Sequence, residues 1–142
     1  MGKKEEVVRL VLDTNVLVSA LLFRSVVSAL FDAWRGDRFR LAVSEPILDE
    51  YQRVLEYPEF RLSEHEASAI MLQLVLPYCD RFQVPDRPRY CTGPDDDKFI
   101  HCALAARAAA LVSGDRAVLA LGPRCGRVRI ISVSDACVRY CR

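Results

Sequence analysis

The stretch "VVRLVLDTNVLVSALLF" (residues 7–23) is the most hydrophobic segment of the chain, and it decides the fold. Residues 7–12 form a short, mostly apolar run rich in β-branched side chains, which predicts a buried strand. Residues 15–22 have the spacing of a helix. Asp13 and Thr14 lie between the two, where a buried carboxylate is costly unless it is paired, hydrogen-bonded or bound to a metal.

Similar alternation continues along the chain. We expect further strands over residues 39–44, 111–115 and 128–133, with a short one at the start of residues 79–97. We expect helices over residues 25–36, 44–57, 63–78 and 98–110, and a short one at the carboxyl end. This order predicts one α/β domain over residues 1–142, with a parallel sheet of four to five strands and helices on both faces. Residues 1–6 are expected to be a flexible extension.

Composition narrows the function classes. The 142 residues carry a net charge of +1, so there is no bulk basic field, and any RNA-binding cations must be arranged locally. No uninterrupted apolar run reaches the roughly 18 residues of a membrane span. The first residues lack the pattern of a signal peptide, so we expect a cytoplasmic protein with no membrane partner. The six cysteines lack zinc-ligand spacing.

Acidic residues follow the predicted strands or flank the predicted helices. Asp13 and Asp115 each end a strand, and the carboxyl ends of parallel strands meet at the edge where such sheets bind ligands. On the helix over residues 44–57, Asp49 falls opposite the apolar stripe, whereas Glu50 falls on its border and faces sideways. Three more acids crowd the start of the alanine-rich helix: Asp95, Asp96 and Asp97.

Each acid also has a purely structural explanation. Asp13 can cap the following helix, and Asp115 is a common turn residue after glycine. Glu50 can be a surface glutamate, and an aspartate cluster complements a helix dipole. Together, however, these acids would repel one another unless a cation lay between them. Oxygen ligands without histidine or cysteine suit Mg²⁺ or Mn²⁺, which indicates metal-assisted phosphodiester hydrolysis.

The motifs "VLDTNVLVSAL", "VSEPILDEYQRVL" and "PDDDKFIHCALAARAAALVSGDRAVL" resemble, in order and spacing, those of the PIN-domain ribonucleases. The similarity runs from about residue 8 to residue 133 and is closest to the toxin components of toxin–antitoxin pairs. It implies a metal-dependent endoribonuclease that uses Mg²⁺ or Mn²⁺, with RNA as substrate, a cognate antitoxin as partner and self-association as a homodimer. The alternative is a non-catalytic PIN module that binds RNA or a protein partner.

The resemblance also implies roles for individual residues. The metal-binding and catalytic acids would be Asp13, Glu50, Asp97 and Asp115, with Asp95 and Asp96 as alternatives to Asp97. The polar residues that support the metal or its waters would be Thr14, Asn15 and Ser113. From proximity in sequence, we expect the phosphate contacts among Arg24, Lys98, His101 and Arg116.

Other classes fit the residues less well. A haloacid-dehalogenase-like phosphatase needs a second aspartate where this chain has Asn15, and a receiver domain needs a lysine later than Lys98. A nucleotide-binding Rossmann module needs a glycine-rich loop that this sequence lacks. The apolar segment "AIMLQLVLPY" (residues 69–78) is either a central packed helix or a dimer or partner interface.

Overall fold

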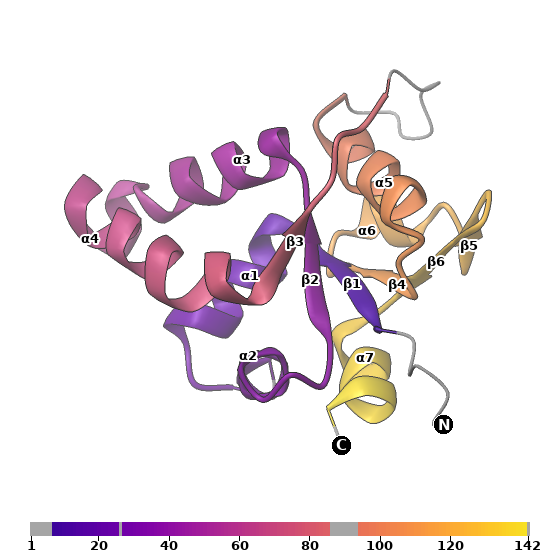
Figure 1. The fold of residues 1–142 in the computed structure, drawn as a ribbon, viewed down its shortest axis with the longest axis horizontal. Coiled ribbons are helices and arrows are strands. Elements are labelled where there is room, and N and C mark those ends of the chain that lie inside the picture. Colours follow the sequence, from indigo (N-terminus) through magenta and orange to yellow (C-terminus); the bar gives the residue numbers. More distant parts are fainter. Residues whose placement is uncertain (1–6, 26, 86–93, 142) are drawn as a thin grey trace, which may run out of the picture.

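The computed structural model describes residues 7–25, 27–85 and 94–141; the side chains of Pro94 and Asp95 are outside this description. The predicted extension at residues 1–6 therefore lies outside the described residues. The strands are β1 (Arg9–Leu12), β2 (Arg40–Val43), β3 (Cys79–Arg81), β4 (Ala110–Val112), β5 (Arg124–Cys125) and β6 (Val128–Ile131). They form one sheet in the order β3-β2-β1-β4-β6-β5, which is parallel except for the antiparallel β5–β6 pair (Figure 1).

The predicted α/β class and parallel sheet are confirmed, with six strands in the described residues instead of four or five. The extra strand, β5, is only two residues long and belongs to a hairpin with β6. Apolar periodicity cannot reveal a strand of that length.

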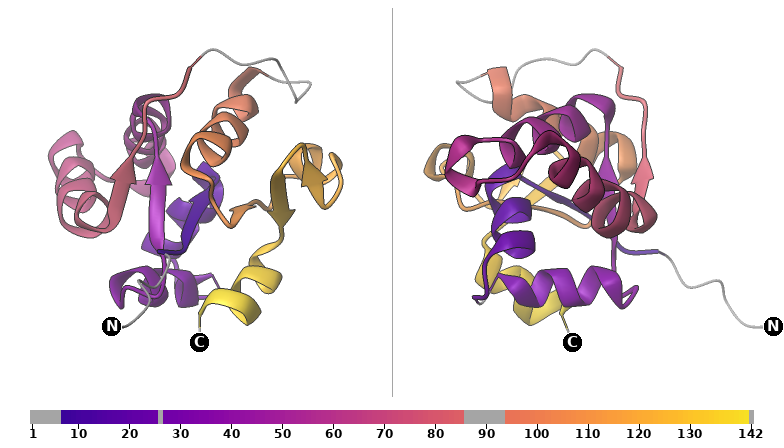
Figure 2. Two further views of the ribbon diagram at one scale, coloured as in Figure 1. Left: turned by 45° about the vertical axis from the view of Figure 1, so that its right-hand side comes forward. Right: turned by 90° about the vertical axis from the view of Figure 1, so that its left-hand side faces the viewer.

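The helices are α1 (Thr14–Leu22), α2 (Ser28–Arg35), α3 (Glu45–Leu55), α4 (Glu64–Ile70), α5 (Pro94–Ala106), α6 (Arg116–Leu119) and α7 (Val133–Tyr140). Helix α5 lies across β1, β2, β4 and β6. Helices α1 to α4 form a connected layer on the other side of the sheet, and α7 contacts α2 below it (Figures 1 and 2). No helix in the described ranges is long and apolar enough to cross a membrane.

Two helices differ from their predicted bounds. The helix predicted over residues 63–78 is α4, which the Ser63–Glu66 capping box begins, followed by a π-helical turn (Met71–Val75) and a 3₁₀ turn (Leu76–Tyr78). Pro77 explains the change, because proline lacks the N–H that an α-helix needs.

The alanine-rich helix begins at Pro94, four residues earlier than predicted, so Asp97 lies in its first turn. Proline is favoured at that position, and acids in the first turn complement the helix dipole. The helix ends at Ala106 because Arg107 takes a left-handed backbone conformation, with φ of 50°.

The core lies between the sheet and its helices, and it fixes where the strands end. Leu10, Val11 and Leu12 of β1 are fully buried, as expected for a central parallel strand covered on both faces. Just beyond β1, the Asp13 N–H donates to the Val112 carbonyl of β4 at 3.1 Å. The carboxyl ends of β1 and β4 are therefore level, and we call the edge they form the carboxyl rim.

Candidate metal centre at the carboxyl rim

Asp13 lies at the carboxyl rim, directly after β1, and only 7% of its surface is exposed. One carboxylate oxygen accepts a hydrogen bond from the Val16 N–H at 3.0 Å and so caps α1. The other accepts from the Ser113 hydroxyl at 2.5 Å. One oxygen of Asp13 thus caps α1, and the other binds the serine that follows the neighbouring strand β4.

Burial raises the pKa of the Asp13 carboxyl above its usual value. Hydrogen bonds from Ser113 and from backbone N–H groups oppose this rise, while the nearby charge of Asp115 adds to it. A cation placed beside this buried carboxyl would stabilise its charged form.

Ser113 and Asp115 follow β4 as Asp13 follows β1. The fully buried Ser113 hydroxyl donates to Asp13 and accepts from the Asp115 N–H at 3.0 Å. Asp115 is exposed, and its carboxylate caps the short helix α6 by accepting from the Ala117 N–H at 2.7 Å. The structure therefore brings these three predicted residues together and gives Asp115 a capping contact as well.

Glu50 reaches the rim from α3, on the side that the sequence pattern predicts, whereas Asp49 is exposed. The Thr14 hydroxyl, buried at the start of α1, donates a short hydrogen bond to the Glu50 Oε2 atom. The Lys98 ammonium lies 2.5 Å from the Glu50 Oε1 atom. The side chains of Glu50 and Lys98 are only 13% and 18% exposed, so solvent screens this ion pair weakly.

Asp97 approaches the rim from the first turn of α5 and is 4% exposed. Asp97 has polar interactions of its own, although its Oδ2 atom is buried without a hydrogen bond to the described residues. Its charge helps to raise the pKa of the Cys125 thiol, after the larger effect of burial. The next residue, Lys98, contacts Glu50 of α3.

Tyr51 supports the rim from beneath. Its hydroxyl donates to the Leu12 carbonyl at 2.5 Å, and its ring is fully buried. Burial raises its pKa well above the usual value, and the charges of Asp13 and Glu50 add to the effect. The proton on Tyr51 is thus retained, and α3 is tied to the end of β1.

The other predicted contacts are spread more widely. Asn15 is exposed on the first turn of α1, and Arg116 is exposed beside Asp115. His101 is half-buried one turn after Asp97. Arg24 does not join them, because it follows the far end of α1, roughly 13 Å of helix away from Asp13.

The acids fit a hard divalent cation in their chemistry, since all are oxygen donors. As the side chains stand, no group of three or more Asp, Glu, His or Cys among the described residues is close enough to hold a metal ion. The Glu50 carboxylate forms an ion pair with Lys98, and the Asp115 carboxylate caps α6.

The Glu50–Lys98 pair is the feature that sequence reasoning missed. Lys98 is the sole lysine after residue 4, and it directly follows the aspartate triplet. A single lysine beside three aspartates points to a specific role for Lys98. Its pairing with Glu50, however, depends on the packing of α5 beside α3.

The comparisons with known proteins agree with the fold. A family model described as "PIN domain" matches residues 9–117, which is most of the chain, so the chain belongs to the PIN-domain family, a nuclease-type fold. The crystal structure of PAE2754 from Pyrobaculum aerophilum is similar in fold, with a TM-score of 0.63 and 21% sequence identity. That similarity covers 94% of this chain and 89% of the other. No curated protein gives a significant match.

Proposed function

We propose that this PIN domain is a divalent-metal-dependent endoribonuclease that hydrolyses phosphodiester bonds in RNA. The observation that supports the proposal is that three acids from separate elements lie at this end of the sheet: Asp13 after β1, Asp115 after β4 and Glu50 from α3. Asp97 adds a fourth acid in the first turn of α5, next to the Lys98 that contacts Glu50. PIN domains are generally nucleases, which agrees with this proposal.

In this proposal Asp13, Asp97 and Asp115 hold Mg²⁺ or Mn²⁺, with Glu50 as a further ligand or as the acceptor for a bound water. Asp95 and Asp96 are the alternatives to Asp97. When bound, the cation supplies Lewis-acid chemistry, which lowers the pKa of water and neutralises charge on the phosphate.

The remaining residues position these acids and the substrate. The Ser113 hydroxyl fixes the orientation of Asp13, and the Thr14 hydroxyl does the same for Glu50. Such supporting hydrogen bonds keep donor oxygens aimed at one point. Asn15, which is exposed on the first turn of α1, would orient water, and Lys98, His101 and Arg116 are the proposed phosphate contacts.

The test is cleavage of a single-stranded RNA labelled at one end, incubated with Mn²⁺ or with EDTA. We expect cleavage with Mn²⁺, none with EDTA, and recovery when Mn²⁺ is added in excess of the chelator. The Asp13→Asn variant, purified identically, should be inactive. Full cleavage in EDTA would rule out the mechanism, and equal cleavage by the variant would point to a contaminating nuclease.

We also propose that the enzyme acts as the toxin of a toxin–antitoxin pair, with a cognate antitoxin and self-association as a homodimer. The support is the motif resemblance, together with exposed apolar side chains such as Leu72, which is 63% exposed in the π-helical turn after α4. Expression in a bacterial host should arrest growth, and expression of Asp13→Asn should not. Equal growth of the two strains would contradict the toxin role.

A non-catalytic module that binds RNA or a protein partner is the second candidate. The observation in its favour is that Glu50 and Asp115 already have partners in the chain. This candidate predicts RNA binding that Mn²⁺ and Asp13→Asn leave unchanged, with no cleavage under any metal condition.

A further inference from the structure

We propose that Lys98 competes with the divalent cation for Glu50, and that a phosphate of the bound nucleic acid releases it. This inference rests on the proposed function, because it concerns how the same site is loaded. It would make metal binding and substrate binding at the rim cooperative.

The first step of the argument is the occupancy of Glu50. Its Oε1 atom lies 2.5 Å from the Lys98 ammonium, and its Oε2 atom accepts the Thr14 hydroxyl. Both oxygens therefore have partners inside the protein. A divalent cation that used Glu50 would lie beside a like charge, so Lys98 has to move before Glu50 can become a ligand.

The second step is the contrast with Arg53, which also approaches Glu50. The Arg53 guanidinium is 3.6 Å from the same Oε1 atom, and its side chain is 63% exposed. An exposed pair at that distance is worth little, whereas the Lys98 pair is shielded and close. Lys98 is therefore the cation that decides whether Glu50 is available.

The third step is where Lys98 would go. A lysine ammonium on a flexible stem can exchange one oxygen partner for another. A phosphate that enters the acidic rim brings the negative charge that the ammonium prefers once a metal cation claims Glu50. By linkage, a phosphate that draws Lys98 away must strengthen metal binding, and metal must strengthen phosphate binding by the same factor.

The test is a calorimetric titration of Mn²⁺ into the full chain, with and without a single-stranded DNA oligonucleotide as the phosphodiester probe. Titration of the oligonucleotide alone supplies the blank, and a gel confirms that it stays intact. For the wild type, we expect the oligonucleotide to tighten Mn²⁺ binding about fivefold or more. In Lys98→Met, Mn²⁺ should bind at least about fivefold more tightly without the oligonucleotide, and its addition should change little.

Two variants serve as controls, and a third guards against misfolding. Arg53→Met removes a positive charge from the same carboxylate, and its Mn²⁺ affinity should stay within about twofold of the wild type. Lys98→Arg keeps the charge, so the oligonucleotide should still tighten Mn²⁺ binding in this variant, as it should not in Lys98→Met. Lys98→Gln should repeat the effect of Lys98→Met if the latter folds poorly, as judged by circular dichroism.

The outcomes separate the two proposals. If Mn²⁺ binds the wild type but Lys98→Met binds it equally or more weakly, the competition is refuted and the metal centre stands. If oligonucleotide leaves Mn²⁺ binding to the wild type unchanged, the release by phosphate is refuted. If neither the wild type nor any variant binds Mn²⁺, the proposed function itself fails, and this inference fails with it.

Discussion

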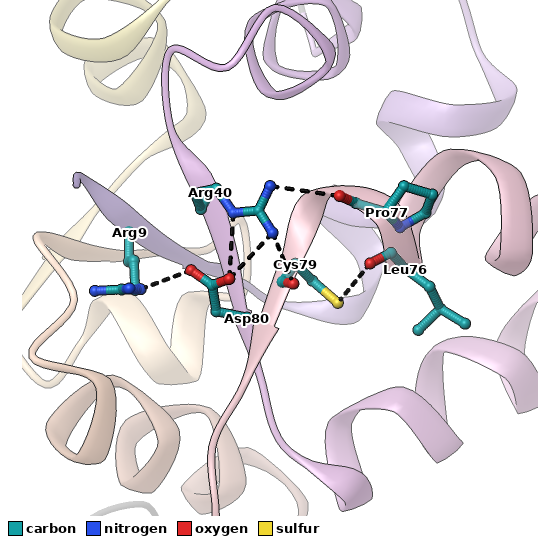
Figure 3. A network of polar contacts seen from close by, with 6 residues as sticks. All are labelled: Arg9, Arg40, Leu76, Pro77, Cys79 and Asp80. Carbon is teal, nitrogen blue, oxygen red and sulfur yellow. Dashed lines mark hydrogen bonds and ion pairs between the residues drawn. The ribbon is translucent and has the colours of Figure 1, made fainter.

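The two ends of β1 use charge in opposite ways. At its amino end, Arg9 and the neighbouring Arg40 of β2 hold Asp80 of β3 between them, at 2.9 Å and 3.0 Å (Figure 3). Beyond its carboxyl end, Asp13 lies at a rim where the proposed acids outnumber the cations beside them. A single strand thus separates a cluster with more cations than acids from one with more acids than cations.

The difference appears in the two aspartates. Burial by itself would raise the pKa of Asp80, but hydrogen bonds and charge from Arg40 and Arg9 outweigh it and lower that pKa. For Asp13, burial prevails and the pKa is raised. The Asp80 cluster ties the edge strand β3 to β2 and β1. At the carboxyl rim, the acids cap α1 and α6 and in our proposal also hold a metal ion.

Removing one acid from each cluster should give the largest contrast. In Asp97→Asn we expect RNA cleavage to fall on the order of 100-fold or more, because the proposed metal site loses a carboxylate. Asp80→Asn should cleave within about twofold of the wild type at temperatures where it is folded, since Asp80 contacts Arg9 and Arg40 and none of the proposed metal-binding acids. Rates should be measured under single-turnover conditions with saturating Mn²⁺. Equal losses in the two variants would show that the clusters are not functionally separate.

The serines that follow β4 and β6 allow a second comparison, between a residue that supports the proposed metal site and one that only caps a helix. Ser113 supports Asp13, whereas Ser132 caps α7 by accepting from the Asp135 N–H at 3.2 Å. Ser113→Ala should lower Mn²⁺-dependent activity about 10-fold to 100-fold, as the loss of a supporting hydrogen bond does at metal sites.

Ser132→Ala is the matched control for that change. It should leave the activity unchanged and cost about 1 kcal/mol of unfolding free energy through the lost cap. Activity losses of similar size in both serine variants would mean that the Ser113 effect is only structural.

Asp80→Asn should show its effect in stability. We expect a loss of about 1–2 kcal/mol, because two arginines lose a charged partner that is about a third exposed. Urea unfolding followed by circular dichroism measures this value. An unchanged midpoint would show that the Arg9–Asp80–Arg40 cluster contributes nothing to the fold.

The smallest expected effect is the pH dependence of that loss. The folded pKa of Asp80 lies below its unfolded value, so its stabilisation is complete above about pH 4 and is lost as the pH falls through the lowered value. The stability difference between wild type and Asp80→Asn should therefore shrink below about pH 4. A difference that stays constant from pH 7 to pH 3 would exclude the charge of Asp80 as its cause.

Local pattern was enough to place the first parts of the site. The strand and helix periods of residues 7–23 put Asp13 at the end of β1, and the apolar stripe of α3 turned Glu50 sideways, as the structure confirms. The capping box at Ser63 is equally local, and both of its hydrogen bonds form. These features depend on neighbours within a few residues, which is what a single sequence displays.

The sequence pattern did not predict contacts between residues that are far apart in the chain. Arg9 and Asp80 are 71 residues apart, and their meeting depends on the strand order and on a β3 of three residues. The Glu50–Lys98 pair depends likewise on how α5 packs beside α3. The earlier start of α5 at Pro94 is consistent with the preference for proline in the first turn of a helix.

The central claim is that the carboxyl rim is a metal centre, and its most direct test is a crystal structure of the protein soaked in Mn²⁺. Data collected at the manganese absorption edge locate the ion by its anomalous scattering. We predict a peak at the carboxyl rim bounded by Asp13, Asp97 and Asp115, and no such peak in crystals of Asp13→Asn. A rim without a peak at saturating Mn²⁺, or a peak that Asp13→Asn leaves in place, would contradict the account.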